Sequence, residues 1–150
     1  MYLSDFLQPS AVRIGLSATT KAGALDELVA VLGLQGRQAE AVTRVLARRE
    51  ELGSTGVGRG IAIPHGRTLA VNRLRLAFGT QPAGIEYQAI DGRPVHALFL
   101  IVAPPLEVAN QYLPVLGKIA QLAREPDVPE RLKRLTSPDE LFALLSEKGV

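Results

Sequence analysis

The chain has 150 residues, 47% of them hydrophobic, so it can bury one core and is expected to form a single domain over residues 1–150. Seventeen basic and 15 acidic residues give a net charge of +2, which is too balanced to indicate nucleic-acid binding. Cysteine is absent, which excludes disulfides and thiolate chemistry, and the two histidines lie far apart, so neither a metal centre nor a cofactor is expected.

The sequence contains no signal for a membrane. No apolar run approaches the roughly 20 residues that span a bilayer. The start Met1-Tyr-Leu-Ser-Asp5 lacks the basic and apolar regions of a signal peptide. We therefore expect a cytoplasmic protein without membrane insertion.

The first 50 residues predict one strand and two helices. Apolar residues alternate over residues 12–16, as in a half-exposed strand. Leucine and valine then recur at helical spacing over residues 25–32. After two glycines, a second helix is predicted from about residue 37 to residue 50, with Val42, Val45 and Leu46 as its apolar stripe.

Three strands are predicted in the middle of the chain. Residues 61–63 and 74–78 alternate, whereas residues 95–102 are apolar almost throughout. A continuous apolar strand is typical of a position covered on both faces of a sheet. We therefore expect residues 95–102 to form a central strand.

Helices are predicted to complete the chain. One runs from about residue 110 to residue 124, with Pro114 near its first turn, where a missing N–H is tolerated. Residues 127–130 and 137–140 have the form of capping boxes and predict two short closing helices. The element order predicts a single-domain α/β fold in which helices cover both faces of one mixed sheet.

The segment 53–66 holds five of the fourteen glycines and one of the two histidines. Glycine lets main-chain N–H groups approach an anion, and Ser54 and Thr55 add hydroxyl donors. Pro64 cannot donate to a sheet, so His65 is expected to project where the strand stops. The pattern favours a phosphohistidine site, and the alternative is a glycine-rich turn with a packed or solvated histidine.

Arg49 is a candidate partner for a phosphoryl group on His65. It follows Val45 by four residues and Leu46 by three, so it leaves the predicted helix on the apolar face. An arginine that points inward needs an anionic partner, and guanidinium binds phosphate well. The alternative is an arginine that extends to solvent and complements the helix C-terminus.

The nineteen residues from Arg49 to Arg67 read Arg-Glu-Glu-Leu-Gly-Ser-Thr-Gly-Val-Gly-Arg-Gly-Ile-Ala-Ile-Pro-His-Gly-Arg. This segment closely resembles the active-site signature of enzyme IIA domains of the mannitol/fructose class. These domains belong to the phosphoenolpyruvate-dependent sugar phosphotransferase system, and nitrogen-regulatory proteins share the signature. The resemblance implies the same α/β fold, with His65 as phosphoacceptor and Arg49 as an active-site arginine.

The resemblance also implies partners. Family members accept the phosphoryl group from an HPr-like phosphocarrier and pass it to a IIB domain, or act as regulators of other proteins. The chain is therefore expected to be a phosphotransferase component, a carrier rather than a stand-alone enzyme, and its length favours the nitrogen-type branch. The choice between sugar transport and regulation stays open.

The chain departs from the family pattern at one position. Many members carry a second histidine in a pattern like His-Leu-x-x-Leu-x-x-Ile-Ala, where this chain reads Tyr112-Leu-Pro-Val-Leu-Gly-Lys-Ile-Ala120. A phenol can donate one hydrogen bond but brings no positive charge at neutral pH. Tyr112 is therefore either a substitute in the site or a core aromatic aligned with Val115 and Ile119.

Further residues are assigned to the site or set outside it. The predicted phosphate-binding residues are Ser54, Thr55, Gly56, Gly66 and Arg67. Arg67 has the alternative of a solvated loop cation, and the basic cluster 131–134 is expected to be a solvated helix face. His96 is expected to be a strand-edge residue with a hydrogen bond to a neighbour.

The favoured function is a phosphohistidine carrier. The alternative is a regulatory binding module that is not phosphorylated, which the tyrosine at position 112 motivates. A hydrolase built on Ser54 and His65 is disfavoured, since no orienting acid or nucleophile elbow is present.

Overall fold

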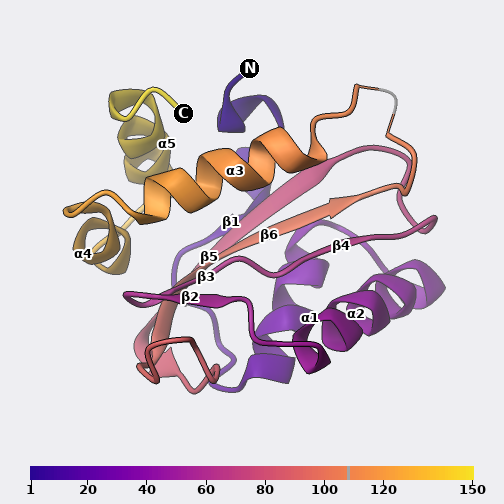
Figure 1. Cartoon of the computed structure of the whole chain (residues 1–150), viewed down its shortest axis with the longest axis horizontal. Helices are drawn as coiled ribbons and strands as arrows, with labels where there is room; N and C mark the ends of the chain where they lie inside the picture. The colour runs from indigo at the N-terminus through magenta and orange to yellow at the C-terminus, as the bar shows by residue number, and fades with distance from the viewer. Residues whose placement is uncertain (108) are drawn as a thin grey trace.

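The computed structural model describes residues 1–107 and 109–150. Figure 1 shows how the elements are arranged along the chain. After two short 3₁₀ turns, the elements are β1 (Val12–Arg13), α1 (Lys21–Val31), α2 (Gly36–Glu51), β2 (Gly56–Gly58), β3 (Ile61–Ala62), β4 (His65–Arg67), β5 (Arg75–Ile85), β6 (Val95–Ala103), α3 (Tyr112–Ala123), α4 (Val128–Lys133) and α5 (Pro138–Glu147).

The strands form one mixed sheet in the order β1-β5-β6-β3-β2, and β4 also pairs with β6. β5 and β6 are antiparallel, whereas β3 and β4 run parallel to β6. Figure 1 shows α1 and α2 on one side of the sheet and α3 with the C-terminal helices on the other. The predicted α/β fold, with helices on both faces of a mixed sheet, is confirmed.

β6 is the centre of the sheet, as its apolar sequence predicts. Every residue from Ala97 to Ala103 is buried, and only His96 in this strand is half-buried. Phe78 of β5 faces Phe99 of β6 across the ladder, with ring centroids 4.7 Å apart. Tilted aromatic pairs at this spacing add stability beyond the area they bury.

The first strand is shorter than predicted. β1 ends at Arg13 because Gly15 has a φ of +85°, a left-handed conformation that glycine adopts readily. The turn directs the Gly15 N–H to the side chain of Thr80, at 2.8 Å. Leu16 is buried as expected, although it lies outside the ladder.

The prediction that His65 follows the end of a strand was wrong in one respect. The strand before it stops at Ala62, and His65 begins β4, with Ile101 of β6 as its register partner. Pro64 separates the two strands, but its carbonyl still accepts from the Ile101 N–H at 3.0 Å. The chain therefore stays beside β6 while Pro64 interrupts the ladder.

Glu50, near the end of α2, is a buried carboxylate whose side chain is 6% exposed. It accepts hydrogen bonds from the Thr55 N–H at 3.0 Å, from the Thr55 hydroxyl and from the Tyr87 hydroxyl at 3.1 Å. Lys21 Nζ lies 3.0 Å from the same carboxylate. The four donors satisfy the buried charge and join α1, α2, the glycine-rich loop and the segment after β5.

The two closing helices are confirmed, and one of the two predicted caps is present. The Ser137 hydroxyl accepts from the Glu140 N–H at 3.3 Å, as a capping box requires. Asp127 instead binds Lys148 at 2.8 Å and Arg131 at 3.1 Å, so it joins α4 to the chain end rather than capping a helix.

The described residues contain no helix that is long and apolar enough to cross a bilayer.

We predict that Glu50→Ala destabilises the fold strongly. The substitution leaves Lys21, Thr55 and Tyr87 without their acceptor, and loss of one partner of a buried ion pair costs about 3 kcal/mol or more. Glu51, its exposed neighbour, is the matched control, and Glu51→Ala should change the free energy of unfolding by less than about 0.5 kcal/mol. Urea denaturation measures both variants. Equal stabilities would contradict the role given to the buried network.

We also predict that Asp127 titrates in strong acid. The hydrogen bond from Lys148, followed by that from Arg131, lowers the pKa of Asp127 from 3.8 to about 2. Because the pKa falls on folding, the stabilisation is present above the unfolded pKa of 3.8 and is lost as the pH drops through about 2. NMR titration of the carboxyl group measures the midpoint. Lys148→Ala should move it toward 3.8, and a wild-type midpoint already there would refute the contact.

Candidate active site

His65 is half-buried at the start of β4, and one of its ring nitrogens is fixed by the backbone. Nδ1 lies 2.7 Å from the carbonyl oxygen of Ile63. A carbonyl oxygen can only accept, so Nδ1 carries the proton of the neutral ring. The lone pair therefore sits on Nε2, which is the nitrogen available as a nucleophile.

Gly66 brings β4 directly against α2. A Cβ at this position would lie 2.7 Å from Cγ1 of Val45, which is too close for any side chain. Gly66 is buried, and its lack of a Cβ lets the strand pack on the helix. Arg49 follows Val45 by one turn, so the same contact aligns Arg49 with β4.

Arg49 is half-buried, whereas Arg44 and Arg48 are exposed, which agrees with its predicted place on the apolar face of the helix. Its Nη1 donates to the carbonyl oxygen of Gly53 at 2.8 Å. This bond fixes the side chain and uses one of the five guanidinium N–H groups.

Tyr112 is the first residue of α3 and is only 6% exposed. Its ring centroid lies 6.3 Å from that of His65, and the Cζ atom of Arg67 lies 4.3 Å from the Tyr112 ring centroid. Burial raises the pKa of the Tyr112 phenol, while the charges of Arg67 and Arg49 oppose this rise. The phenol stays protonated at neutral pH, and Tyr112 is at once a buried aromatic and a neighbour of His65.

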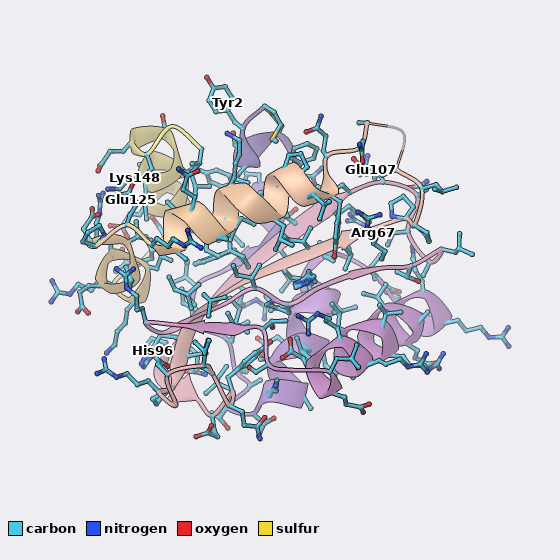
Figure 2. The ribbon with its side chains drawn as sticks, viewed as in Figure 1. Tyr2, Arg67, His96, Glu107, Glu125 and Lys148 are labelled. Carbon is cyan, nitrogen blue, oxygen red and sulfur yellow. The ribbon has the colours of Figure 1, made fainter. Side chains whose placement is uncertain are left out.

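Three elements therefore meet at one place. The C-terminal turn of α2 supplies Arg49, β4 supplies His65 and Arg67, and the start of α3 supplies Tyr112. Figure 2 shows Arg67 beside β4, below the N-terminal end of α3. The site combines a nucleophilic imidazole with two guanidinium groups and a phenol.

The polar groups of the glycine-rich loop that were predicted to bind phosphate make contacts within the protein. Ser54 donates its hydroxyl proton to the Tyr87 carbonyl at 2.7 Å and accepts from the Gly56 N–H at 3.1 Å. The hydroxyl and N–H of Thr55 both bind Glu50. These donors of Ser54, Thr55 and Gly56 are occupied within the protein, so their predicted contact with phosphate finds no support in the geometry.

Glu107 is a residue that sequence reasoning missed. Its carboxylate accepts from the N–H groups of Gln111 at 2.8 Å and Tyr112 at 3.0 Å, at the start of α3. Figure 2 shows it on the loop that leads to this helix. The only sequence signal is an acidic residue just before a predicted helix, where negative charge is favourable.

His96 lies away from the site, near the start of β6, five residues before the register partner of His65. Figure 2 shows it at the other end of the sheet from Arg67. Its Nδ1 is 3.1 Å from the carbonyl oxygen of Gln81, the kind of neighbour contact that was predicted. The geometry also gives no support to a Ser54–His65 hydrolase, because the Ser54 hydroxyl faces Tyr87.

The sequence of the chain is similar to those of known phosphotransferase-system proteins. A family model described as "Phosphoenolpyruvate-dependent sugar phosphotransferase system, EIIA 2" matches residues 5–148. The nitrogen regulatory protein of Bradyrhizobium diazoefficiens is 34% identical over 147 residues, which cover 97% of this chain and 95% of that protein. The fructose-specific EIIABC component of Bacillus subtilis is 29% identical, and the match covers 98% of this chain but 23% of that longer protein.

The fold is also similar to those of solved enzyme IIA structures. The crystal structure of the nitrogen regulatory protein IIA-Ntr from Neisseria meningitidis superposes with a TM-score of 0.86 at 30% identity, covering 95% of this chain and 98% of that one. Enzyme IIA mannitol of Escherichia coli, in its complex with phosphorylated enzyme IIB mannitol, gives a TM-score of 0.74 at 25% identity, covering 94% and 99%. The chain therefore belongs to the EIIA 2 family of the phosphoenolpyruvate-dependent sugar phosphotransferase system.

Proposed function

We propose that the protein is a phosphohistidine carrier in which Nε2 of His65 accepts a phosphoryl group from an HPr-like phosphocarrier. The observation that carries the proposal is the 2.7 Å contact between Nδ1 and the Ile63 carbonyl. It fixes the tautomer in which Nε2 holds a lone pair. A neutral nucleophile with a fixed orientation is what phosphoryl transfer to histidine requires.

The proposed step exchanges one N–P bond for another. The lone pair of Nε2 forms a bond to phosphorus while the N–P bond of the donor phosphohistidine breaks, and the electron pair of that bond stays on the donor nitrogen. Nδ1 keeps its proton, directed at Ile63. No general base is needed, because no proton is removed from His65.

Catalysis of this step rests on position and charge. The transition state spreads negative charge over the equatorial phosphoryl oxygens, and fixed donors stabilise it without reorganising. Arg49 is the proposed ligand of these oxygens. Its side chain is half-buried and donates a hydrogen bond to the Gly53 carbonyl. It also lies on the helical turn that follows the contact of α2 with β4.

The surroundings of His65 suit a protein as donor. Three leucines follow a site residue in the chain by one to three positions and are largely exposed: Leu52 at 82%, Leu69 at 89% and Leu113 at 65%. Exposed apolar side chains beside cationic groups are typical of a docking surface for a protein. This supports an HPr-like donor rather than a small molecule.

For the acceptor we favour a regulatory target protein over a sugar-specific IIB domain. Nitrogen regulatory proteins match this chain over nearly their whole length, which supports the regulatory branch. The complex formed by the mannitol IIA relative with its phosphorylated IIB partner supports a IIB-type acceptor as the second candidate.

We predict that phosphoenolpyruvate, enzyme I and an HPr-type carrier add one acid-labile phosphoryl group to the wild type and none to His65→Ala. The reason is that His65 is the proposed acceptor. Intact-mass measurement reads the modification, and His96→Ala, which changes the other histidine, should be modified like the wild type. An unmodified wild type would mean a binding module that works without phosphoryl transfer.

We further predict that the phosphoryl group sits on Nε2. Because Nδ1 donates to Ile63, it has no lone pair for attack. Two-dimensional ¹H–¹⁵N spectra of the phosphorylated imidazole distinguish the two isomers by their ring-nitrogen shifts. Phosphorylation on Nδ1 would show that the contact with Ile63 breaks before transfer.

A further inference from the structure

We propose that Arg67 is a second phosphate-binding residue of this site and that Tyr112 is the platform that positions it. The inference rests on the proposed function, since the phosphoryl group it concerns is the one on His65. It assigns a role to a cation–π pair in which Arg67 lies over the ring of Tyr112, the neighbour of His65.

Strand geometry places Arg67 on the side of His65. Successive side chains of a strand point to opposite faces, so residues 65 and 67 of β4 share one face while Gly66 packs on α2. Tyr112 lies next to both: its ring centroid is 6.3 Å from that of His65 and 4.3 Å from Cζ of Arg67. The guanidinium and the imidazole therefore lie on the same face of β4 and border the same aromatic ring.

Two contacts hold the guanidinium in place. Its Cζ atom lies over the Tyr112 ring, 4.3 Å from the ring centroid, and Nη1 donates to the carbonyl oxygen of Pro105 at 3.3 Å. The ring beneath it is fixed, because Tyr112 is buried and its N–H is held by Glu107. A guanidinium held by two contacts has less freedom to lose when it binds an anion.

Several donors of the glycine-rich loop and of the start of α3 are occupied within the protein. The hydroxyls of Ser54 and Thr55 and the Gly56 N–H bind within the protein, and the first N–H groups of α3 bind Glu107. Tyr112 is uncharged at neutral pH. A phosphoryl dianion on His65 therefore has Arg49 and Arg67 as its cationic ligands.

The test measures the phosphorylation rate of His65 with two donors, the phosphorylated HPr-type carrier and the small molecule phosphoramidate. The variants are Arg67→Gln, Tyr112→Ala, Tyr112→Phe and the exposed control Arg48→Gln. The carrier docks on the protein surface, whereas phosphoramidate does not. The comparison therefore separates binding of phosphate from binding of the carrier. Thermal unfolding of each variant establishes that it is folded.

Arg67→Gln should slow phosphorylation by about a hundredfold to a thousandfold with both donors, as expected for loss of one transition-state ligand. Tyr112→Ala should slow phosphorylation by a similar factor. The double variant Tyr112→Ala/Arg67→Gln should be no slower than either single variant, because both substitutions abolish the same contact between guanidinium and ring. Tyr112→Phe, which keeps the ring, should recover most of the rate lost in Tyr112→Ala. Arg48→Gln should behave as the wild type.

Two results would overturn the inference. A defect of Arg67→Gln with the carrier alone would make Arg67 a docking residue. A loss in Tyr112→Phe as large as in Tyr112→Ala would assign the effect to the phenol hydroxyl rather than to the stack. If the carrier fails even with the wild type, the proposed function fails, but the phosphoramidate rates still decide the role of Arg67.

Discussion

The parallel pairing of β4 with β6 is the constraint on which the site depends. Three residues make up β4, yet they hold the imidazole beside the centre of the sheet because the Pro64 carbonyl keeps its bond to Ile101. The glycine within β4 then admits α2 to van der Waals contact at Val45. One short ladder thus aligns a nucleophile from the sheet with an arginine from the helix.

Side chains supply the charge of the site, and hydrogen bonds to backbone groups fix the positions of those side chains. Backbone carbonyls orient His65, Arg49 and Arg67, and carboxylates hold the surrounding segments: Glu50 under the glycine-rich loop and Glu107 at the start of α3. The carboxylates are bound to backbone and buried partners. The cationic groups near His65 therefore keep their charge for an incoming anion.

Sequence patterns correctly predicted the features that depend on residues close together in the chain. The helix over residues 37–50, the apolar central strand, His65 beside a proline and Arg49 on the apolar face all follow from spacing within a few residues. The roles of Ser54 and Thr55 could not be predicted in this way. The hydroxyl of Ser54 binds the carbonyl of Tyr87, more than thirty positions away, and that pairing exists only once the sheet has formed. The contact of Arg67 with the Tyr112 ring joins β4 to α3, so it too forms only when distant segments come together.

The contact between Gly66 and Val45 also limits how the two elements of the site can move. Helix and strand touch without an intervening side chain, so neither can slide or tilt without a clash or a void in a close-packed interior. The guanidinium at the helix end and the imidazole on the strand belong to one rigid body. The spacing between these two groups is consequently set by the packing of the fold, and a movement of the strand would carry the end of the helix with it.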